Sequence, residues 1–108
     1  MQEQRKSRRF DLKLPLELLR NGSQKLLESG ETRNVSSSGV LFRTAARLEP
    51  GDIVEYVITL PSSSQSIAVR LKCRGKIVRR AAETDTATEA AATLERWEFV
   101  RGQTLKPT

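Results

Sequence analysis

Hydrophobic side chains recur at every second position in several short stretches of the sequence. Leucine fills each even position of residues 12–18, and the same period marks residues 54–60 and 67–73. A period of two places successive side chains on opposite faces of a β-strand. Next to two of these stretches stand Asn21-Gly22 and Pro50-Gly51-Asp52, which are typical of tight turns. The pattern therefore predicts short strands joined by turns.

Six strands are expected in all. They fall near residues 12–20, 25–35, 40–42, 54–60, 67–78 and 94–100. Within them, Ser29-Gly30 suggests a bulge and Gly75 suggests a bend. Residues 81–93, AAETDTATEAAAT, have no large apolar face, and we expect an exposed loop with at most one helical turn. Six short strands without βαβ alternation favour an all-β barrel or sandwich that forms one domain.

The chain is strongly basic, with a formal net charge of +6 and 13 arginines against 6 lysines. A basic surface attracts phosphate or acidic groups, and arginine pairs bidentately with phosphate and with guanine edges. The single cysteine, Cys73, excludes an internal disulfide, and without histidine no Cys/His zinc site can form. No segment has the apolar length of a signal sequence or of a membrane span, so we expect a cytoplasmic protein without membrane insertion.

Two segments stand out as candidate binding elements. The first, Arg5-Lys6-Ser7-Arg8-Arg9, precedes the first expected strand and therefore lies on a tail. The second, Asn34-Val35-Ser36-Ser37-Ser38-Gly39, lies between two expected strands. Taken alone, each has an ordinary explanation. A basic tail is usually solvated, and a serine-rich run that ends in glycine usually forms a turn in which the glycine takes a positive φ angle.

Together and in this order, the two segments resemble the PilZ domain family. Members of that family combine an Arg-x-x-x-Arg motif before the first strand with an Asp/Asn-x-Ser-x-x-Gly motif at a strand end, and the two motifs bind cyclic di-GMP. Apolar alternation after Arg9, the Val-Leu-Phe run at 40–42 and the Pro50-Gly51 turn extend the resemblance. It covers residues 4–80, with a weaker match at 94–100.

The resemblance implies a fold, a ligand and a set of site residues. The fold is a six-stranded antiparallel β-barrel of the split-barrel type over residues 12–102, with a flexible basic arm at 1–11 before it and a tail at 103–108 after it. No metal, no catalytic residue and no cofactor other than the ligand is implied. The expected ligand-binding residues are Arg5, Arg9, Asn34, Ser36 and Gly39, with Lys6 and Arg8 as auxiliary cations that steer the ligand.

The chemistry of these side chains suits cyclic di-GMP, which carries two phosphates and two guanines. A bidentate arginine–guanine contact is worth about 1–3 kcal/mol, and Arg5 and Arg9 have the required groups. Asn34 offers a carbonyl oxygen to guanine N–H groups, and Ser36 offers a hydroxyl. Gly39 is expected to supply a backbone bend that a residue with a Cβ does not make easily. We therefore expect a receptor whose arm closes over the ligand and changes the surface shown to a protein partner.

Other classes of function stay open. A basic, arginine-rich β-barrel could instead bind the phosphate backbone of a nucleic acid, although the five aromatic residues are expected in the core and not on a stacking surface. A PilZ-like adapter that binds only protein is another alternative. An enzyme is not expected, because the chain has no histidine and no paired carboxylates. Cys73 alternates with charged residues, as a buried structural thiol in a strand would.

Overall fold

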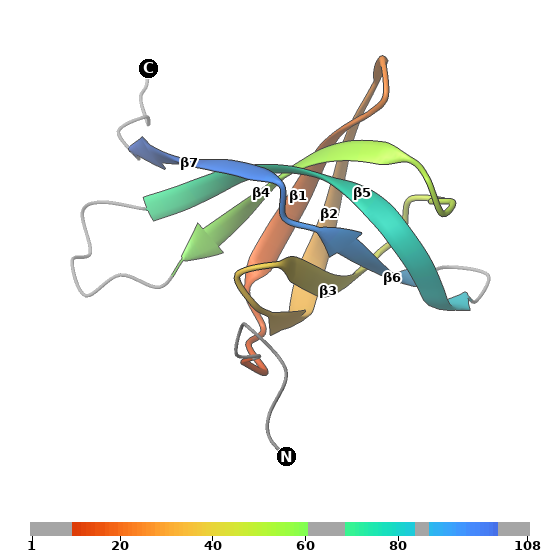
Figure 1. Cartoon of the computed structure of the whole chain (residues 1–108), viewed down its shortest axis with the longest axis horizontal. Coiled ribbons are helices and arrows are strands. Elements are labelled where there is room, and N and C mark those ends of the chain that lie inside the picture. Colours follow the sequence, from red (N-terminus) through yellow and green to blue (C-terminus); the bar gives the residue numbers. More distant parts are fainter. Residues whose placement is uncertain (1–9, 61–68, 84–86, 102–108) are drawn as a thin grey trace.

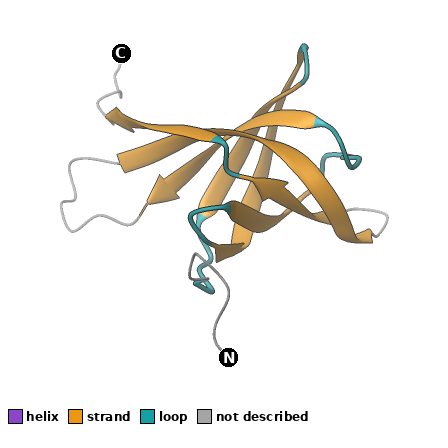
Figure 2. Cartoon of the chain, in the orientation of Figure 1, coloured by secondary structure: helices purple, strands orange, loops and turns teal. Residues whose placement is uncertain are grey.

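The computed structural model describes residues 10–60, 69–83 and 87–101 of the chain, which form seven β-strands joined by turns (Figure 1). The described residues contain no helix, as the colouring of Figure 2 shows. The all-β class is therefore confirmed. The predicted arm and tail, at 1–11 and 103–108, fall largely outside the described residues. The strands are β1 (Pro15–Asn21), β2 (Gln24–Val35), β3 (Gly39–Thr44), β4 (Ile53–Leu60), β5 (Val69–Glu83), β6 (Thr88–Thr93) and β7 (Arg96–Arg101).

Six of these strands close into an antiparallel barrel. Their order is β4-β1-β2-β3-β6-β5, and a pairing of β4 with β5 closes the ring. Strand β7 lies outside the ring, where it pairs with the first part of β5 (Figure 1). The expected six-stranded antiparallel barrel is confirmed, but one of its six strands is not the predicted one. The last barrel strand is β6, whereas the predicted strand at 94–100 largely corresponds to the outer strand β7.

The prediction for residues 81–93 was wrong, because this segment is not an exposed loop. Its first residues continue β5, and Thr88–Thr93 form β6, which pairs with β3 along its whole length. The side chains of Thr88, Ala90 and Ala92 face the interior, each at most 2% exposed. Period-two alternation is present here, but the inward side chains are too small to form a recognisable apolar face. Pairing with β3 and β5 overrides the helical preference of alanine.

Aliphatic side chains and two aromatic rings fill the barrel interior. Phe42 and Tyr56 are fully buried, and their ring centroids are 6.1 Å apart. The Tyr56 hydroxyl donates a hydrogen bond of 3.1 Å to the carbonyl oxygen of Thr93, which satisfies this polar group in the core. The predicted inward face of the first strand begins at Leu14, since Leu12 is 40% exposed. The buried apolar residues are Leu14, Leu16, Leu18, Val40, Phe42, Ala46, Leu48, Val54, Tyr56, Ile58, Cys73, Ile77, Ala90 and Ala92.

The turn between β1 and β2 is the hairpin that Asn21-Gly22 predicted. Gly22 has a φ angle of +63°, and Asn21 is the last residue of β1 to pair with β2. The predicted bulge at Ser29-Gly30 was wrong, because the register shift between these strands lies between Leu18 and Arg20. On the β2 side of this irregularity, Leu27 has a φ angle of +73° and is 66% exposed.

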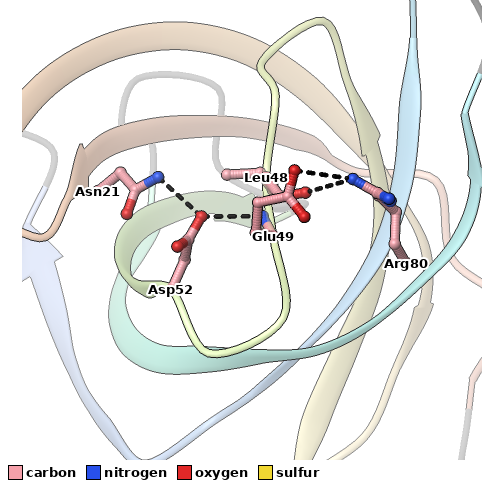
Figure 3. Close-up of polar contacts among 5 residues, drawn as sticks. All are labelled: Asn21, Leu48, Glu49, Asp52 and Arg80. Carbon is pink, nitrogen blue, oxygen red and sulfur yellow. Dashed lines mark hydrogen bonds and ion pairs between the residues drawn. The ribbon is translucent and has the colours of Figure 1, made fainter.

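A carboxylate holds the turn that leads into β4. The Asp52 side chain accepts hydrogen bonds of 2.9 Å from the Asn21 side chain and of 2.9 Å from the backbone amide of Glu49 (Figure 3). Gly51 has a φ angle of +96°, which fits the predicted Pro50-Gly51-Asp52 turn. The turn is thereby fixed to the end of the β1–β2 hairpin.

Strand β5 passes through Gly75 without a break in its pairing. Up to Lys76 it pairs with β4, up to Arg74 it also pairs with β7, and from Ile77 onward it pairs with β6. The carbonyl oxygen of Thr93, at the end of β6, lies where a Cβ at position 75 would be. Glycine at this position lets the chain leave β6 and enter β7 while it stays beside β5.

Candidate functional site

The serine-rich segment forms a tight turn between the end of β2 and the start of β3. The Ser36 hydroxyl accepts hydrogen bonds of 3.2 Å from the backbone amides of both Ser38 and Gly39. The Ser36 amide donates a bond of 2.9 Å to the carbonyl oxygen of Gly39. The side chain of Ser36 therefore builds the turn, as local hydrogen bonding by serine often does.

Gly39 is required by a close contact and not by a bend. Among the described residues, the glycines with a positive φ angle are Gly22 and Gly51. Gly39 does not have a positive φ angle, so it does not make the left-handed bend that was expected at this position. A Cβ at position 39 would lie 2.9 Å from the carbonyl oxygen of Ala92, and such a distance is shorter than a real Cβ contact. Glycine here lets β3 start against β6, where Gly39 pairs with Thr93.

The first described residues of the chain are bonded to the end of β2. Phe10 and Val35 exchange two backbone hydrogen bonds, of 2.8 Å and 2.9 Å, in an isolated antiparallel bridge. The Asn34 side-chain amide donates a hydrogen bond of 2.8 Å to the carboxylate of Asp11. Residues 10–11 thus run alongside the strand-end motif. The other predicted site residues, Arg5, Lys6, Arg8 and Arg9, lie outside the described residues.

A surface cavity of about 300 Å³ opens beside this turn. Three of the predicted site residues, Asn34, Ser36 and Gly39, line one side of it. The other lining residues are Ser38 of the turn, Val40 and Leu41 of β3, residues 91–93 of β6, and Val78 and Arg79 of β5. The structure therefore brings the described part of the predicted site together at a single cavity.

Arg79 is a cavity residue that the sequence did not single out. Among the described residues that line the cavity, Arg79 alone has a charged side chain. This side chain is exposed and makes no ion pair with any described residue. The neighbouring Arg80 instead contacts the β3–β4 turn, at 3.0 Å from the Glu49 carboxylate and 3.4 Å from the carbonyl oxygen of Leu48 (Figure 3). Arg79 can thus offer its guanidinium to an anion in the cavity.

An apolar groove of about 340 Å³ lies on the other side of the same turn. Ser36 lines both the cavity and the apolar groove. Phe10, Trp97 and Phe99 form much of the wall of the groove. These three aromatic side chains are 52%, 55% and 61% exposed. The prediction that all five aromatic residues lie in the core was therefore wrong, and the objection it raised against a nucleic-acid-binding barrel no longer holds.

Cys73 is buried in the barrel, as expected for a structural thiol. Burial raises the pKa of its thiol from the ordinary 9.0 to about 12. Because only the thiolate reacts, we expect alkylation by iodoacetamide at pH 8 to be at least about 100-fold slower in the folded protein than in guanidinium chloride. The same raised pKa means that the contribution of the neutral thiol to stability is fully present below about pH 9 and is lost as the pH rises from about 9 to about 12. Equal alkylation rates of Cys73 in the folded protein and in guanidinium chloride would contradict the burial of this thiol.

Within the described ranges, no group of three or more histidine, cysteine, aspartate or glutamate residues is arranged to hold a metal ion. The same part of the chain forms no helix long and apolar enough to cross a membrane. The arrangement around the β2–β3 turn instead offers hydrogen-bonding groups, one arginine and a shallow cavity. These groups are suited to bind an anion that carries amide-like edges.

Comparison with known proteins adds one match. The family model described as "PilZ domain" matches residues 3–98, which include both candidate binding segments, strands β1 to β6 and the first half of β7. No curated protein matches the chain.

Proposed function

Because the chain belongs to the PilZ domain family, we propose that it is a receptor for cyclic di-GMP whose surface changes when the ligand binds, so that it regulates a protein partner. The family supports cyclic di-GMP as the class of ligand. The ligand-binding residues in this proposal are Arg5, Arg9, Asn34, Ser36 and Gly39, with Lys6 and Arg8 as auxiliary cations.

The observation that carries the proposal is the bridge between Phe10 and Val35. Arg9 directly precedes Phe10 in the sequence, and Val35 lies between Asn34 and Ser36. Since consecutive Cα atoms are about 3.8 Å apart, the basic arm joins the barrel beside the strand-end motif. We propose that the guanidinium groups of an arm attached at this point reach a ligand in the adjoining cavity.

The contacts around the turn suggest a division of roles. The Asn34 amide nitrogen already donates to Asp11, so its carbonyl oxygen is the group that we propose for guanine N–H groups. The Ser36 hydroxyl holds the amides of Ser38 and Gly39, so its main contribution is to fix the shape of the turn. Guanidinium groups from the arm and from Arg79 would pair with the phosphates and with guanine O6 and N7.

Isothermal titration calorimetry tests the proposal against its alternatives. We expect saturable binding of cyclic di-GMP with a dissociation constant of about 1 µM, which corresponds to about −8 kcal/mol. GTP and a short oligonucleotide serve as comparison ligands in the same buffer. Absence of heat with cyclic di-GMP at tens of micromolar, together with saturable binding of the oligonucleotide, would overturn the receptor assignment.

A nucleic-acid-binding barrel is the second candidate, and one observation favours it. Exposed aromatic rings on a basic protein can stack on unpaired bases, and Phe10, Trp97 and Phe99 are exposed on a chain of net charge +6. In that case the affinity for the oligonucleotide would fall steeply with salt. A nearly salt-independent oligonucleotide signal, or none, would eliminate this candidate.

Arg79 gives a prediction within the proposed site. Arg79→Ala should weaken cyclic di-GMP binding by at least about tenfold, because a hydrogen bond to a charged group contributes about 1.5–3 kcal/mol. The matched control is Arg70→Ala, which removes an exposed arginine of the same strand away from the cavity and should leave the affinity within about twofold. Equal losses in the two variants would mean that only net charge matters at this surface.

A further inference from the structure

The outer strand β7 has one paired edge and one edge without a described neighbour. Its register with β5 runs from Val69↔Arg101 to Arg74↔Arg96, and no other described strand pairs with it. In Figure 1 it extends from the barrel beside β5 as the last strand of the sheet. An open strand edge presents backbone N–H and C=O groups that another chain can pair with.

One face of β7 is aromatic and exposed. Trp97 and Phe99 occupy alternate positions, which places them on the same face, and they are 55% and 61% exposed. Their rings contact each other edge to face, with centroids 5.5 Å apart. Exposed aromatic side chains at the edge of a sheet are typical of an interaction surface.

The charges of β7 are only partly matched inside the chain. Arg96 stands opposite Arg74 in the register with β5, and like charges directly opposite each other are unfavourable. Glu98 stands opposite Lys72. The sequence Arg96-Trp97-Glu98 is, however, complementary to a second copy of itself. If two such strands pair antiparallel with Trp97 opposite Trp97, each arginine lies opposite a glutamate.

We infer that β7 is a self-association strand through which two copies of this chain pair antiparallel about a two-fold axis at Trp97. In this register Arg96 lies opposite Glu98 of the partner subunit, and the reciprocal pair forms as well. The two Trp97 side chains meet on the other face and cover part of the exposed aromatic surface. A register centred on Glu98 is less favourable, because it places two carboxylates opposite each other.

Sedimentation velocity of the full chain tests this inference without any ligand, so its outcome is independent of the proposed function. One pair of short strands buries less than the roughly 1,600 Å² of a standard stable interface, so we expect a weak dimer. The wild-type chain should shift from a mass of 12.1 kDa toward twice that mass as its concentration rises to about 1 mM, where even a dissociation constant of about 1 mM leaves many dimers. A chain that stays monomeric at that concentration overturns the inference.

Charge exchange tests the register. Arg96→Glu should abolish the dimer, because it places two acids opposite each other across the interface, yet it removes the Arg74–Arg96 conflict and so should not lower the thermal midpoint. The double variant R96E/E98R should regain the dimer. Lys25→Glu is the matched control, since it makes the same charge change opposite Arg20 on the barrel and should dimerise like the wild type.

The contradicting results are equally specific. An Arg96→Glu variant that dimerises like the wild type shows that Arg96 does not lie opposite Glu98 of the partner subunit. A folded double variant that stays monomeric, with its fold verified by circular dichroism, shows that the Arg96–Glu98 pairs do not hold the dimer. Either result overturns the inferred pairing.

Discussion

Arg9→Ala is expected to abolish cyclic di-GMP binding while the thermal midpoint of the ligand-free protein stays nearly unchanged. In the proposed site Arg9 contributes charge-assisted hydrogen bonds to phosphate or guanine, each worth about 1.5–3 kcal/mol. Loss of two such bonds lowers the affinity by at least about 100-fold. The core cluster and the pairings of β1 to β7, which stabilise the described barrel, are made by residues from Leu14 onward. Calorimetry measures the first effect and differential scanning fluorimetry the second.

The control for Arg9 is a neighbour on the same arm. Arg8→Ala removes the same charge from a position outside the Arg-x-x-x-Arg motif, and as a steering cation it should lower the affinity far less and mainly at low salt. If both variants lost binding equally, the charge of the arm and not the position of Arg9 would explain the affinity. If Arg9→Ala instead unfolded the ligand-free protein, Arg9 would be a structural residue.

Gly75→Ala is expected to destabilise the fold by about 3 kcal/mol or more. The added Cβ would overlap the carbonyl oxygen of Thr93 and lie 2.7 Å from its carbonyl carbon. Thr93 cannot easily move away. Its carbonyl oxygen accepts the Tyr56 hydroxyl at 3.1 Å, and its own hydroxyl accepts the Lys76 amide at 2.9 Å and donates to Glu95 at 2.8 Å. Overpacking of a rigid site typically costs about 1–3 kcal/mol, and the loss of hydrogen bonds around Thr93 adds to it.

Gly22→Ala is the control for the substitution at Gly75. Nothing lies within 4 Å of a Cβ at Gly22, so its cost is only the positive φ angle, about 1 kcal/mol. For a domain of this size about 1 kcal/mol shifts the thermal midpoint by roughly 4–8 °C. We therefore expect the midpoint of Gly75→Ala to fall well below that of Gly22→Ala. Similar midpoints would show that the packing of Thr93 against Gly75 is looser than the structure indicates.

Much of the barrel could be predicted from large apolar side chains and from turn residues. Two leucines of β1, Leu16 and Leu18, occupy alternate positions and are buried, and so are Val54, Tyr56 and Ile58 in β4. Asn21-Gly22 and Gly51 stand at turns where positive φ angles are observed. These signals are local, because strand period and turn conformation depend on neighbouring residues.

The failures share a physical cause, namely that they depend on contacts between distant segments. Strand β6 buries alanine and threonine, which become inward-facing only because β3 and β5 flank it. The exposure of Trp97 and Phe99 follows from the departure of β7 from the barrel at Gly75. Arg79 reaches the candidate site only through the pairing of β5 with β6, which the sequence did not indicate.

The candidate site itself was predictable in its residue types and less so in its geometry. Asn34, Ser36 and Gly39 line a common cavity, as their spacing suggested. The roles of two of these residues differ from those expected. Gly39 lets β3 start close to β6, and the Ser36 hydroxyl accepts hydrogen bonds from backbone amides of the turn. Arginine positions 5 and 9 lie outside the described residues, so their part in binding remains a prediction.

The proposed function requires that cyclic di-GMP binds where the basic arm joins the β2–β3 turn. A titration of the ¹⁵N-labelled full chain with cyclic di-GMP, followed by amide chemical shifts, tests both the binding and its position. We predict saturable shifts at Asn34, Ser36 and Gly39, at Arg79 and in the arm around Arg5 and Arg9, with little change at Gly22 and Gly51 on distant turns. An absence of saturable shifts, or shifts confined to Trp97 and Phe99 in the apolar groove, would contradict the claim.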